Sequence, residues 1–176
     1  MRDLVLTEQF KDTNIIFATQ DLPGNINHKI EERNYAIEIL YSNDLEELIG
    51  IIKKHSIDMI VIDHYGIDYD FEKALKEITD VTIFVLDDTY EKHYCDILLN
   101  HNAYGDNIKY KSLVPKNSEV RCGLKHTLLR NEFIKEKQKG RQCKNNANQL
   151  NAFISMGGSD HSNINIKISH FYYNYN

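Results

Sequence analysis

The sequence predicts an α/β fold built around a mostly parallel β-sheet. Two observations carry this prediction. Short runs of aliphatic and β-branched residues alternate along the chain with segments in which apolar residues recur at helical spacing. The most apolar run, residues 57–62, leads directly into the polar stretch DHYGID, and two later runs end in polar residues in the same way. Strands that alternate with helices at this spacing form βαβ units, whose strands pair in parallel.

The first part of the chain is expected to hold two helices, two strands and the start of a third helix. Residues 14–18 form a continuous β-branched-rich run, which is typical of a strand covered on both faces. Asp44, with Glu47 three residues later, has the spacing of a capping box and predicts that a helix begins there. The other elements expected in this part are helices at 2–11 and 26–33, a turn at 22–25 and a strand at 36–41.

Strands and helices continue to alternate up to residue 139, and a second α/β pattern begins near residue 152. After the strand at 57–62 we expect a helix at 71–78, strands at 81–86 and 96–99, an irregular connection over 102–124 and a helix at 128–139. The polar residues that follow are suited to a linker, and the strand-like run AFISM then enters a glycine pair. We therefore expect a first domain over 1–140, a linker over 141–151 and the start of a second domain over 152–176.

Composition argues against several classes of partner. The chain has 176 residues, 41% of them hydrophobic, and a net charge of -5 without a long basic run, so a nucleic acid is not the expected partner. Its apolar runs are far shorter than the ~20 residues of a membrane span, and its N-terminus lacks the pattern of a signal peptide. We therefore expect a cytoplasmic protein with no nucleic-acid or membrane partner.

The three cysteines, Cys95, Cys122 and Cys143, form no paired motif. Cys122 and His126 have the spacing of metal ligands, but no second pair completes a tetrahedral site. We expect reduced, structural thiols and no bound metal.

Polar side chains follow three neighbouring strands of the predicted sheet, at the points where these strands end. In an open parallel sheet, ligands bind in the crevice beyond the carboxyl ends of the strands. The positions concerned are Asp63, His64 and Tyr65 after the first strand, Asp87 and Asp88 after the second, and Asn100 and Asn102 after the third. We therefore interpret this edge of the sheet as the candidate ligand site.

Each of these side chains also has a purely structural interpretation. An aspartate at a strand end often caps a helix or forms a turn, and for Asp87 this structural interpretation has the same weight as a role in the site. His64 could be a hydrogen-bonded packing residue, and Tyr65 could lie over the sheet edge with its hydroxyl in water. The spacing alone leaves these alternatives open.

The loop MGGSD, residues 156–160, has a pattern suited to binding phosphate. Two glycines after a strand let the backbone approach a ligand closely, and amides at the following helix start can hold a phosphate. A Gly-Gly pair is also often only a turn. Its position between a strand-like run and a predicted helix favours the phosphate interpretation.

The chain resembles a known family in four motifs that occur in register, namely IDHYGID, CDILLNHNAYGDN, EVRCGLKHTLLRNEF and ISMGGSD. This is the family of hydrolases that remove UDP from UDP-2,4-diacetamido-2,4,6-trideoxy-β-L-altropyranose. The family belongs to pseudaminic acid biosynthesis, which supplies the sugar for flagellin glycosylation in some Gram-negative bacteria. The match runs along nearly the whole chain, apart from its last ten residues.

The resemblance implies a glycosyltransferase-B-like architecture of two Rossmann-like domains that face a cleft. The N-terminal domain would hold the sugar and the C-terminal domain most of the UDP, while water attacks the anomeric carbon with inversion, without a metal or cofactor. Tyr65 corresponds to a tyrosine considered important at the family's active site, and Gly157 and Gly158 correspond to the loop near the diphosphate. The predicted substrate contacts are completed by Asp63, His64, Asn100, Asn102 and Ser159.

The chain departs from the family's pattern at both ends. The family begins with a strand and a Gly-x-Gly-His-x-x-Arg loop, whose histidine is expected to position or activate the water, and Arg2 aligns with the arginine of that loop. That histidine and that strand would precede Met1, and the tail KISHFYYNYN does not continue the family's second domain. We therefore expect a Rossmann-like fold truncated at both ends, an impaired UDP-sugar hydrolase, and a monomer if it folds. The alternatives are a glycosyltransferase of the same architecture and a non-catalytic remnant of a frameshifted gene.

Overall fold

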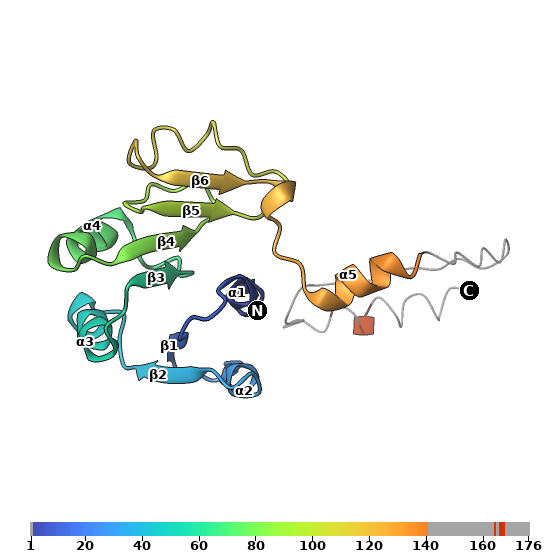
Figure 1. Cartoon of the computed structure of the whole chain (residues 1–176), viewed down its shortest axis with the longest axis horizontal. Coiled ribbons are helices and arrows are strands. Elements are labelled where there is room, and N and C mark those ends of the chain that lie inside the picture. Colours follow the sequence, from blue (N-terminus) through green and yellow to red (C-terminus); the bar gives the residue numbers. More distant parts are fainter. Residues whose placement is uncertain (1, 141–163, 165, 168–176) are drawn as a thin grey trace, which may run out of the picture. The chain divides into compact units, whose positions relative to one another are not determined.

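The computed structural model describes residues 2–140, 164, 166 and 167. Helices and strands alternate along the chain, and the strands pair in parallel, which confirms the predicted α/β fold with parallel sheets (Figure 1). The chain divides into two units, Met1–Glu136 and Lys137–Asn176, and all described strands belong to the first.

The predicted linker over 141–151 lies outside the described residues, as does nearly all of the predicted second-domain start over 152–176. The domain boundaries therefore stay a prediction, and so does the glycine-rich loop at 156–160.

The described residues form six strands, five α-helices and two short 3₁₀ turns. The strands are β1 (Ile16–Gln20), β2 (Ala36–Leu40), β3 (Met59–Ile62), β4 (Thr82–Leu86), β5 (Ile97–Asn100) and β6 (Glu119–Cys122). The helices are α1 (Arg2–Leu6), α2 (Asn27–Glu31), α3 (Leu45–His55), α4 (Tyr69–Ile78) and α5 (Asn131–Gln138), with 3₁₀ turns at Thr7–Gln9 and Leu124–His126.

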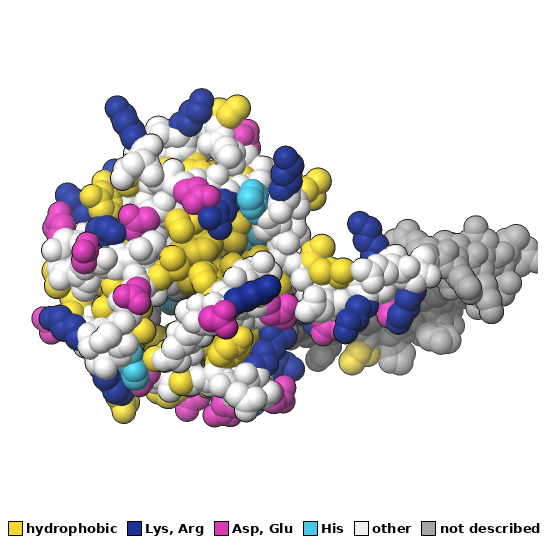
Figure 2. Space-filling model, viewed as in Figure 1, with side chains coloured by type: hydrophobic (Ala, Val, Ile, Leu, Met, Phe, Trp, Pro, Cys, Tyr) yellow, Lys and Arg dark blue, Asp and Glu magenta, His cyan; other side chains and the backbone are white. Residues whose placement is uncertain are grey.

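The strands form two parallel sheets rather than the one sheet that we expected. β1 pairs with β2, and the second sheet has the order β3-β4-β5-β6, so β1 and β3 are not hydrogen-bonded to each other (Figure 1). Among the described strands β3 is therefore an edge strand, and its Met59 and Val61 are each 36% exposed, whereas nearly all side chains of the inner strand β4 are buried. Hydrophobic side chains also reach the surface near the middle of the face shown in Figure 2.

The core lies on both faces of β4 and β5. On one face, Leu75 of α4 packs with Ile83 and Leu98, and all three side chains are fully buried. On the other face, Leu6 of α1 packs with Phe84. Because successive residues of a strand point to opposite faces, α4 and α1 cover opposite faces of these strands. This packing holds the carboxyl ends of β4 and β5 in a fixed position, where the predicted site residues begin.

A strand lies within the connection over 102–124, which we expected to be irregular. β6 pairs in parallel with β5. Glu119 and Arg121 form an ion pair at the surface, while Val120 and Cys122 pack against the core. A run of four residues that is apolar at only two alternate positions gives too weak a periodic signal to predict a strand.

The start of α3 also differs from the predicted capping box. The side chain of Asp44 makes no capping hydrogen bond. Glu47 instead accepts hydrogen bonds from the backbone N–H groups of Tyr41 and Ser42, each at 2.9 Å. The carboxylate therefore ties the first turn of α3 to the residues that follow β2, while the backbone N–H of Asp44 donates to the Ser42 hydroxyl.

Candidate functional site

A cavity of about 460 Å³ lies where the carboxyl ends of β3 and β4 meet the start of α4. Its lining includes the three residues that the sequence places after β3, namely Asp63, His64 and Tyr65, together with Asp87 and His93. This is the crevice in which open parallel sheets bind ligands. The volume is within the ~300–1,000 Å³ typical of small-molecule sites.

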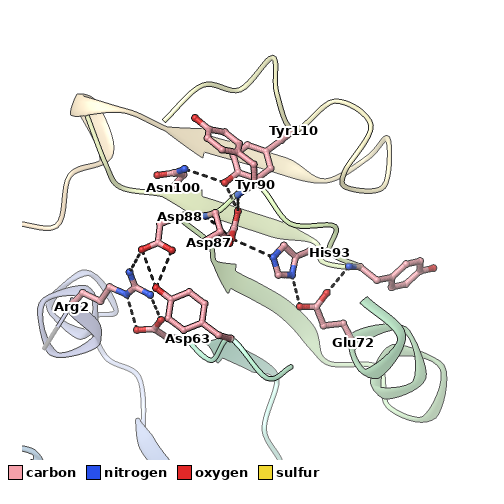
Figure 3. Close-up of polar contacts among 12 residues, drawn as sticks. Arg2, Asp63, Glu72, Asp87, Asp88, Tyr90, His93, Asn100 and Tyr110 are labelled. Atoms are coloured by element: carbon pink, nitrogen blue, oxygen red, sulfur yellow. Dashed lines mark hydrogen bonds and ion pairs between the residues drawn. The ribbon is translucent and has the colours of Figure 1, made fainter. Parts of the chain in front are cut away.

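Arg2, at the start of α1, bridges the ends of β3 and β4 (Figure 3). Its Nε donates to Asp63 Oδ2 at 2.8 Å and its Nη2 donates to the other oxygen of the same carboxylate. Its Nη1 donates to Asp88 Oδ2 at 3.2 Å. A two-pronged guanidinium–carboxylate pair fixes geometry as well as charge, so α1 and these strand ends are held together at the mouth of the cavity.

This ion pair sets the protonation of the carboxyl groups beside it. Burial disfavours ionisation of Asp63, but the hydrogen bonds and charge of Arg2 hold the pKa of Asp63 below its usual range. Burial, together with the charge of Asp63, raises the pKa of Asp3 to about 6. Asp63 is therefore ionised at neutral pH, and the neighbouring Asp3 is a carboxyl group that titrates close to neutrality.

Tyr65 combines an anchored hydroxyl with an exposed ring. Its hydroxyl donates to the Asp88 carboxylate, at 3.0 Å from Oδ1 and 3.2 Å from Oδ2. The residue as a whole is 76% exposed. The hydroxyl is thus engaged by the protein, whereas the sequence alone left open that it points into water. The ring is the part of this side chain that a ligand can reach.

His64 folds back on its own turn. Its Nδ1 accepts a hydrogen bond from the backbone N–H of Gly66 at 3.0 Å, and its Nε2 lies 3.5 Å from the Asn43 side-chain nitrogen. A β-carbon placed on Gly66 would lie 2.9 Å from the imidazole ring, so the ring can hold this position only while residue 66 is small or the ring moves. His64 therefore shapes the loop that presents Tyr65, as in the packing interpretation of the sequence.

Asp87 and His93, which line the cavity, belong to a buried polar network (Figure 3). His93 Nδ1 lies 2.7 Å from Glu72 Oε1, and its Nε2 lies 3.8 Å from Asp87 Oδ1. Tyr110 donates its hydroxyl hydrogen to Asp87 Oδ2 at 2.5 Å and accepts a hydrogen bond from Asn100 Nδ2 at 3.1 Å. All five residues are less than 10% exposed. The network joins α4 to the segments that follow β4 and β5.

The network holds an imidazolium between two carboxylates. Burial disfavours the charge on His93, but the carboxylates of Asp87 and Glu72 raise the pKa of His93 to about 9. Burial likewise opposes ionisation of Asp87, but the positive charge of nearby His93 and the hydrogen bond from Tyr110 hold the pKa of Asp87 far below its usual range. Because the pKa of His93 is higher in the folded chain, its contribution to stability is complete below about pH 6.5 and is lost as pH rises through about 9.

The network also forms the loops that follow β4 and β5. Asp87 accepts hydrogen bonds from the backbone N–H groups of Thr89 and Tyr90, so it is a turn former, which was one of the two interpretations of its position. Asn100 is fully buried, and its Oδ1 accepts a hydrogen bond from the backbone N–H of Asn102 at 3.2 Å. Asp87 and Asn100 are therefore buried side chains that fix the backbone of the loops at the edge of the site.

The structure thus gathers most of the residues predicted for the site at one edge. Asp63 and Tyr65 meet through Arg2 and Asp88, while Asn100 is linked to Asp87 through Tyr110. Contact of Asp63, His64, Tyr65, Asn100 or Asn102 with a substrate stays a prediction. Gly157, Gly158 and Ser159 lie outside the described residues.

Sequence reasoning did not identify Glu72 or His93. Glu72 carried a signal, because it precedes Leu75 by three residues and therefore shares the inward face of its helix, where an acidic residue needs a partner. His93 lies in a segment without regular secondary structure, where no periodicity reveals burial.

His101, directly after β5, is a further imidazole near this edge. Burial and the positive charge of Arg2 lower the pKa of His101, against the opposing charges of Asp88 and Asp63. At neutral pH His101 is therefore uncharged and able to accept a proton.

Neither a metal site nor a membrane span is found in the described part of the chain. Residues 2–140, 164, 166 and 167 contain no group of three or more His, Cys, Asp or Glu side chains placed to hold a metal ion. Among the helices described, none combines the length and apolarity needed to cross a bilayer.

Comparison with known proteins confirms the resemblance drawn from the motifs. No family model matches the chain. The chain is 42% identical over 168 residues to UDP-2,4-diacetamido-2,4,6-trideoxy-beta-L-altropyranose hydrolase of Campylobacter jejuni, an alignment that covers 96% of this chain and 58% of that protein. It is 29% identical over 163 residues to an uncharacterized protein of Methanocaldococcus jannaschii, covering 91% of this chain and 33% of that protein. The chain therefore spans less than two thirds of the length of either relative.

Proposed function

We propose that this chain serves the hydrolysis of a UDP-linked 2,4-diacetamido-2,4,6-trideoxy sugar to free sugar and UDP, in pseudaminic acid biosynthesis. The identity of 42% to the Campylobacter hydrolase supports this assignment. The observation that carries it in the structure is the exposed ring of Tyr65, anchored through its hydroxyl at the cavity that lies beyond the carboxyl ends of β3 and β4.

The charge of the cavity favours the sugar over the diphosphate as its occupant. Its lining includes the carboxyl groups of Asp63, Asp68, Asp70, Asp87 and Glu91, against Lys92 and the charged His93. Carboxylates repel a diphosphate but accept hydrogen bonds from hydroxyl and amide N–H groups. A sugar with two acetamido substituents offers such donors, so we assign the cavity to the sugar.

In the reaction that we propose, a water molecule attacks the anomeric carbon from the face opposite the nucleotide. The bond from this carbon to the diphosphate oxygen breaks, UDP leaves with the bonding electrons, and the attacking water gives up a proton to the surrounding solvent. Tyr65, Asp63 and His64 form the wall that orients the sugar. A sugar held in this way has already lost most of its freedom to rotate and move, so the entropic part of the activation barrier is smaller.

The diphosphate would be held by a second domain in a glycosyltransferase-B-like arrangement. Within that proposal residues 1–140 form the Rossmann-like sugar domain, 141–151 the linker, and 152–176 the first part of the nucleotide domain. Gly157, Gly158 and Ser159 would lie near the diphosphate, where backbone N–H groups can bind phosphate oxygens.

Release of UDP tests this function directly. The purified chain is expected to release UDP from UDP-2,4-diacetamido-2,4,6-trideoxy-β-L-altropyranose faster than from UDP-N-acetylglucosamine, because only the first sugar carries both acetamido groups. UDP would be quantified over long incubations at high protein concentration. Equal release from both substrates, or release no faster than in buffer, contradicts the proposal.

A further inference from the structure

Two tyrosines at the edge of the site have their hydroxyl groups bound to the same residue while their rings face solvent. Tyr65 donates to the Asp88 carboxylate, and Tyr104 donates to the Asp88 backbone oxygen at 3.0 Å. Tyr65 is 76% exposed and Tyr104 is 59% exposed. A tyrosine on a protein surface usually packs its ring and leaves its hydroxyl in water, so this pair has the reverse orientation.

The two tyrosines come from the chain segments on either side of the one that carries Asp88. Tyr65 follows β3, Asp88 follows β4 and Tyr104 follows β5, and these three strands are neighbours in the sheet. Adjacent strands are about 4.8 Å apart, so β3 and β5 are separated by roughly 10 Å. Because both hydroxyls lie 3.0 Å from oxygens of Asp88, the two side chains also meet at this one residue, and a single sugar ring placed there is close to both.

Tyr90 holds the backbone of Tyr104 in place. Tyr90 donates its hydroxyl hydrogen to the backbone oxygen of Tyr104 at 2.9 Å, and the centroids of the two rings are 6.4 Å apart. Tyr90 itself has a φ of 62°, a left-handed conformation that is uncommon for an aromatic residue, and Asp87 accepts its backbone N–H. A rigid, exposed aromatic ring gives contact area at a low cost in conformational entropy.

We propose that Tyr104 and Tyr65 together form an aromatic wall that stacks on the apolar face of the pyranose ring. The inference rests on the proposed function, since it names a further residue that binds the sugar of that substrate. The acidic side chains that line the cavity beside Tyr65, and the Asp88 residue that binds both hydroxyls, disfavour the alternative that the pair receives the nucleotide end.

The test compares Tyr104→Phe with Tyr104→Leu. Both substitutions remove the hydrogen bond to Asp88, but only the leucine removes the aromatic face, so any effect of that hydrogen bond on folding is common to both. Tyr41→Leu is the matched control, because Tyr41 is 93% exposed and follows β2 of the other sheet. Thermal unfolding of each variant would establish that the fold is retained.

The probe is methyl 2-acetamido-2-deoxy-β-glucopyranoside, titrated with each variant and followed by proton NMR. With the wild type, Tyr104→Phe and Tyr41→Leu, we expect similar affinities and upfield ring-current shifts of the sugar protons. With Tyr104→Leu we expect about tenfold weaker binding and smaller upfield shifts, which is the size of effect expected for loss of one aromatic contact.

The inference is overturned if the phenylalanine and leucine variants weaken binding equally, if neither does, or if the wild type does not bind the probe. UDP would also be titrated alone. The inference is overturned if Tyr104→Leu weakens the binding of UDP but does not weaken the binding of the sugar. If Tyr104→Leu weakens sugar binding but the chain releases UDP from both substrates equally, the proposed function is contradicted and the inference is not. Selective UDP release that Tyr104→Leu leaves unchanged contradicts the inference alone.

Discussion

Replacing Glu72 by glutamine is expected to lower the free energy of unfolding by about 3–5 kcal/mol, because the buried charge of His93 loses the carboxylate at 2.7 Å and keeps only Asp87, at 3.8 Å. Glu72 is fully buried, accepts the backbone N–H of Tyr94 at 2.6 Å and lies 2.7 Å from His93 Nδ1. Glutamine preserves the shape of the side chain but offers no negative charge to His93.

Urea denaturation at two pH values would measure this effect. At pH 6 the wild type holds the full contribution of the charged His93, and this contribution declines as pH rises through about 9. Glu72→Gln should lose stability mostly at the lower pH, and its pH dependence should be flatter. The matched control is Glu77→Gln, since the Glu77 side chain on the same helix is 65% exposed. Equal effects of the two substitutions would show that the buried network contributes little.

The chain is also expected to release UDP about 10²–10⁴-fold more slowly than the Campylobacter hydrolase, which is the contribution that a positioned general base makes. The loop histidine that the resemblance assigns to activating the water is expected ahead of Arg2, outside the 176 residues that would be assayed. The carboxylates of Asp63 and Asp88 beside Tyr65 are poorly placed to remove a proton from water, because both are bound to Arg2.

The two proteins would be assayed side by side at equal concentration with the same substrate. Comparable turnover would contradict the expectation and would direct attention to other groups at this edge. His101, uncharged at neutral pH, and Asp3, with a pKa raised to about 6, are the first to substitute in that case.

The sequence was sufficient to predict the alternation of elements and the edge that carries the site. β3 and β4 are continuous apolar runs that end in aspartates, and their carboxyl ends do form the cavity. Local periodicity identifies the strands, and ligands bind beyond the carboxyl ends of parallel strands, so predicting these features does not require knowing which side chains are in contact.

The contacts within the site could not be predicted, because they join residues far apart in the chain. Arg2 binds Asp63 and Asp88, which lie 61 and 86 residues away, and the pairing depends on how α1 packs on the sheet. The division into two sheets was missed for a similar reason. Hydrophobic periodicity identifies β1 and β3 as strands, but it does not specify which strands pair.

Contact between the substrate and the Tyr65 ring tests most directly whether this edge holds the sugar. The chain would be labelled with ¹³C in its tyrosine rings and titrated with UDP-2,4-diacetamido-2,4,6-trideoxy-β-L-altropyranose, with resonances assigned from Tyr65→Phe and Tyr41→Phe. We predict that the substrate shifts the Tyr65 ring resonances and leaves those of Tyr41 in place. Tyr65 resonances that stay unchanged while other signals report bound substrate would contradict the assignment of this edge to the sugar.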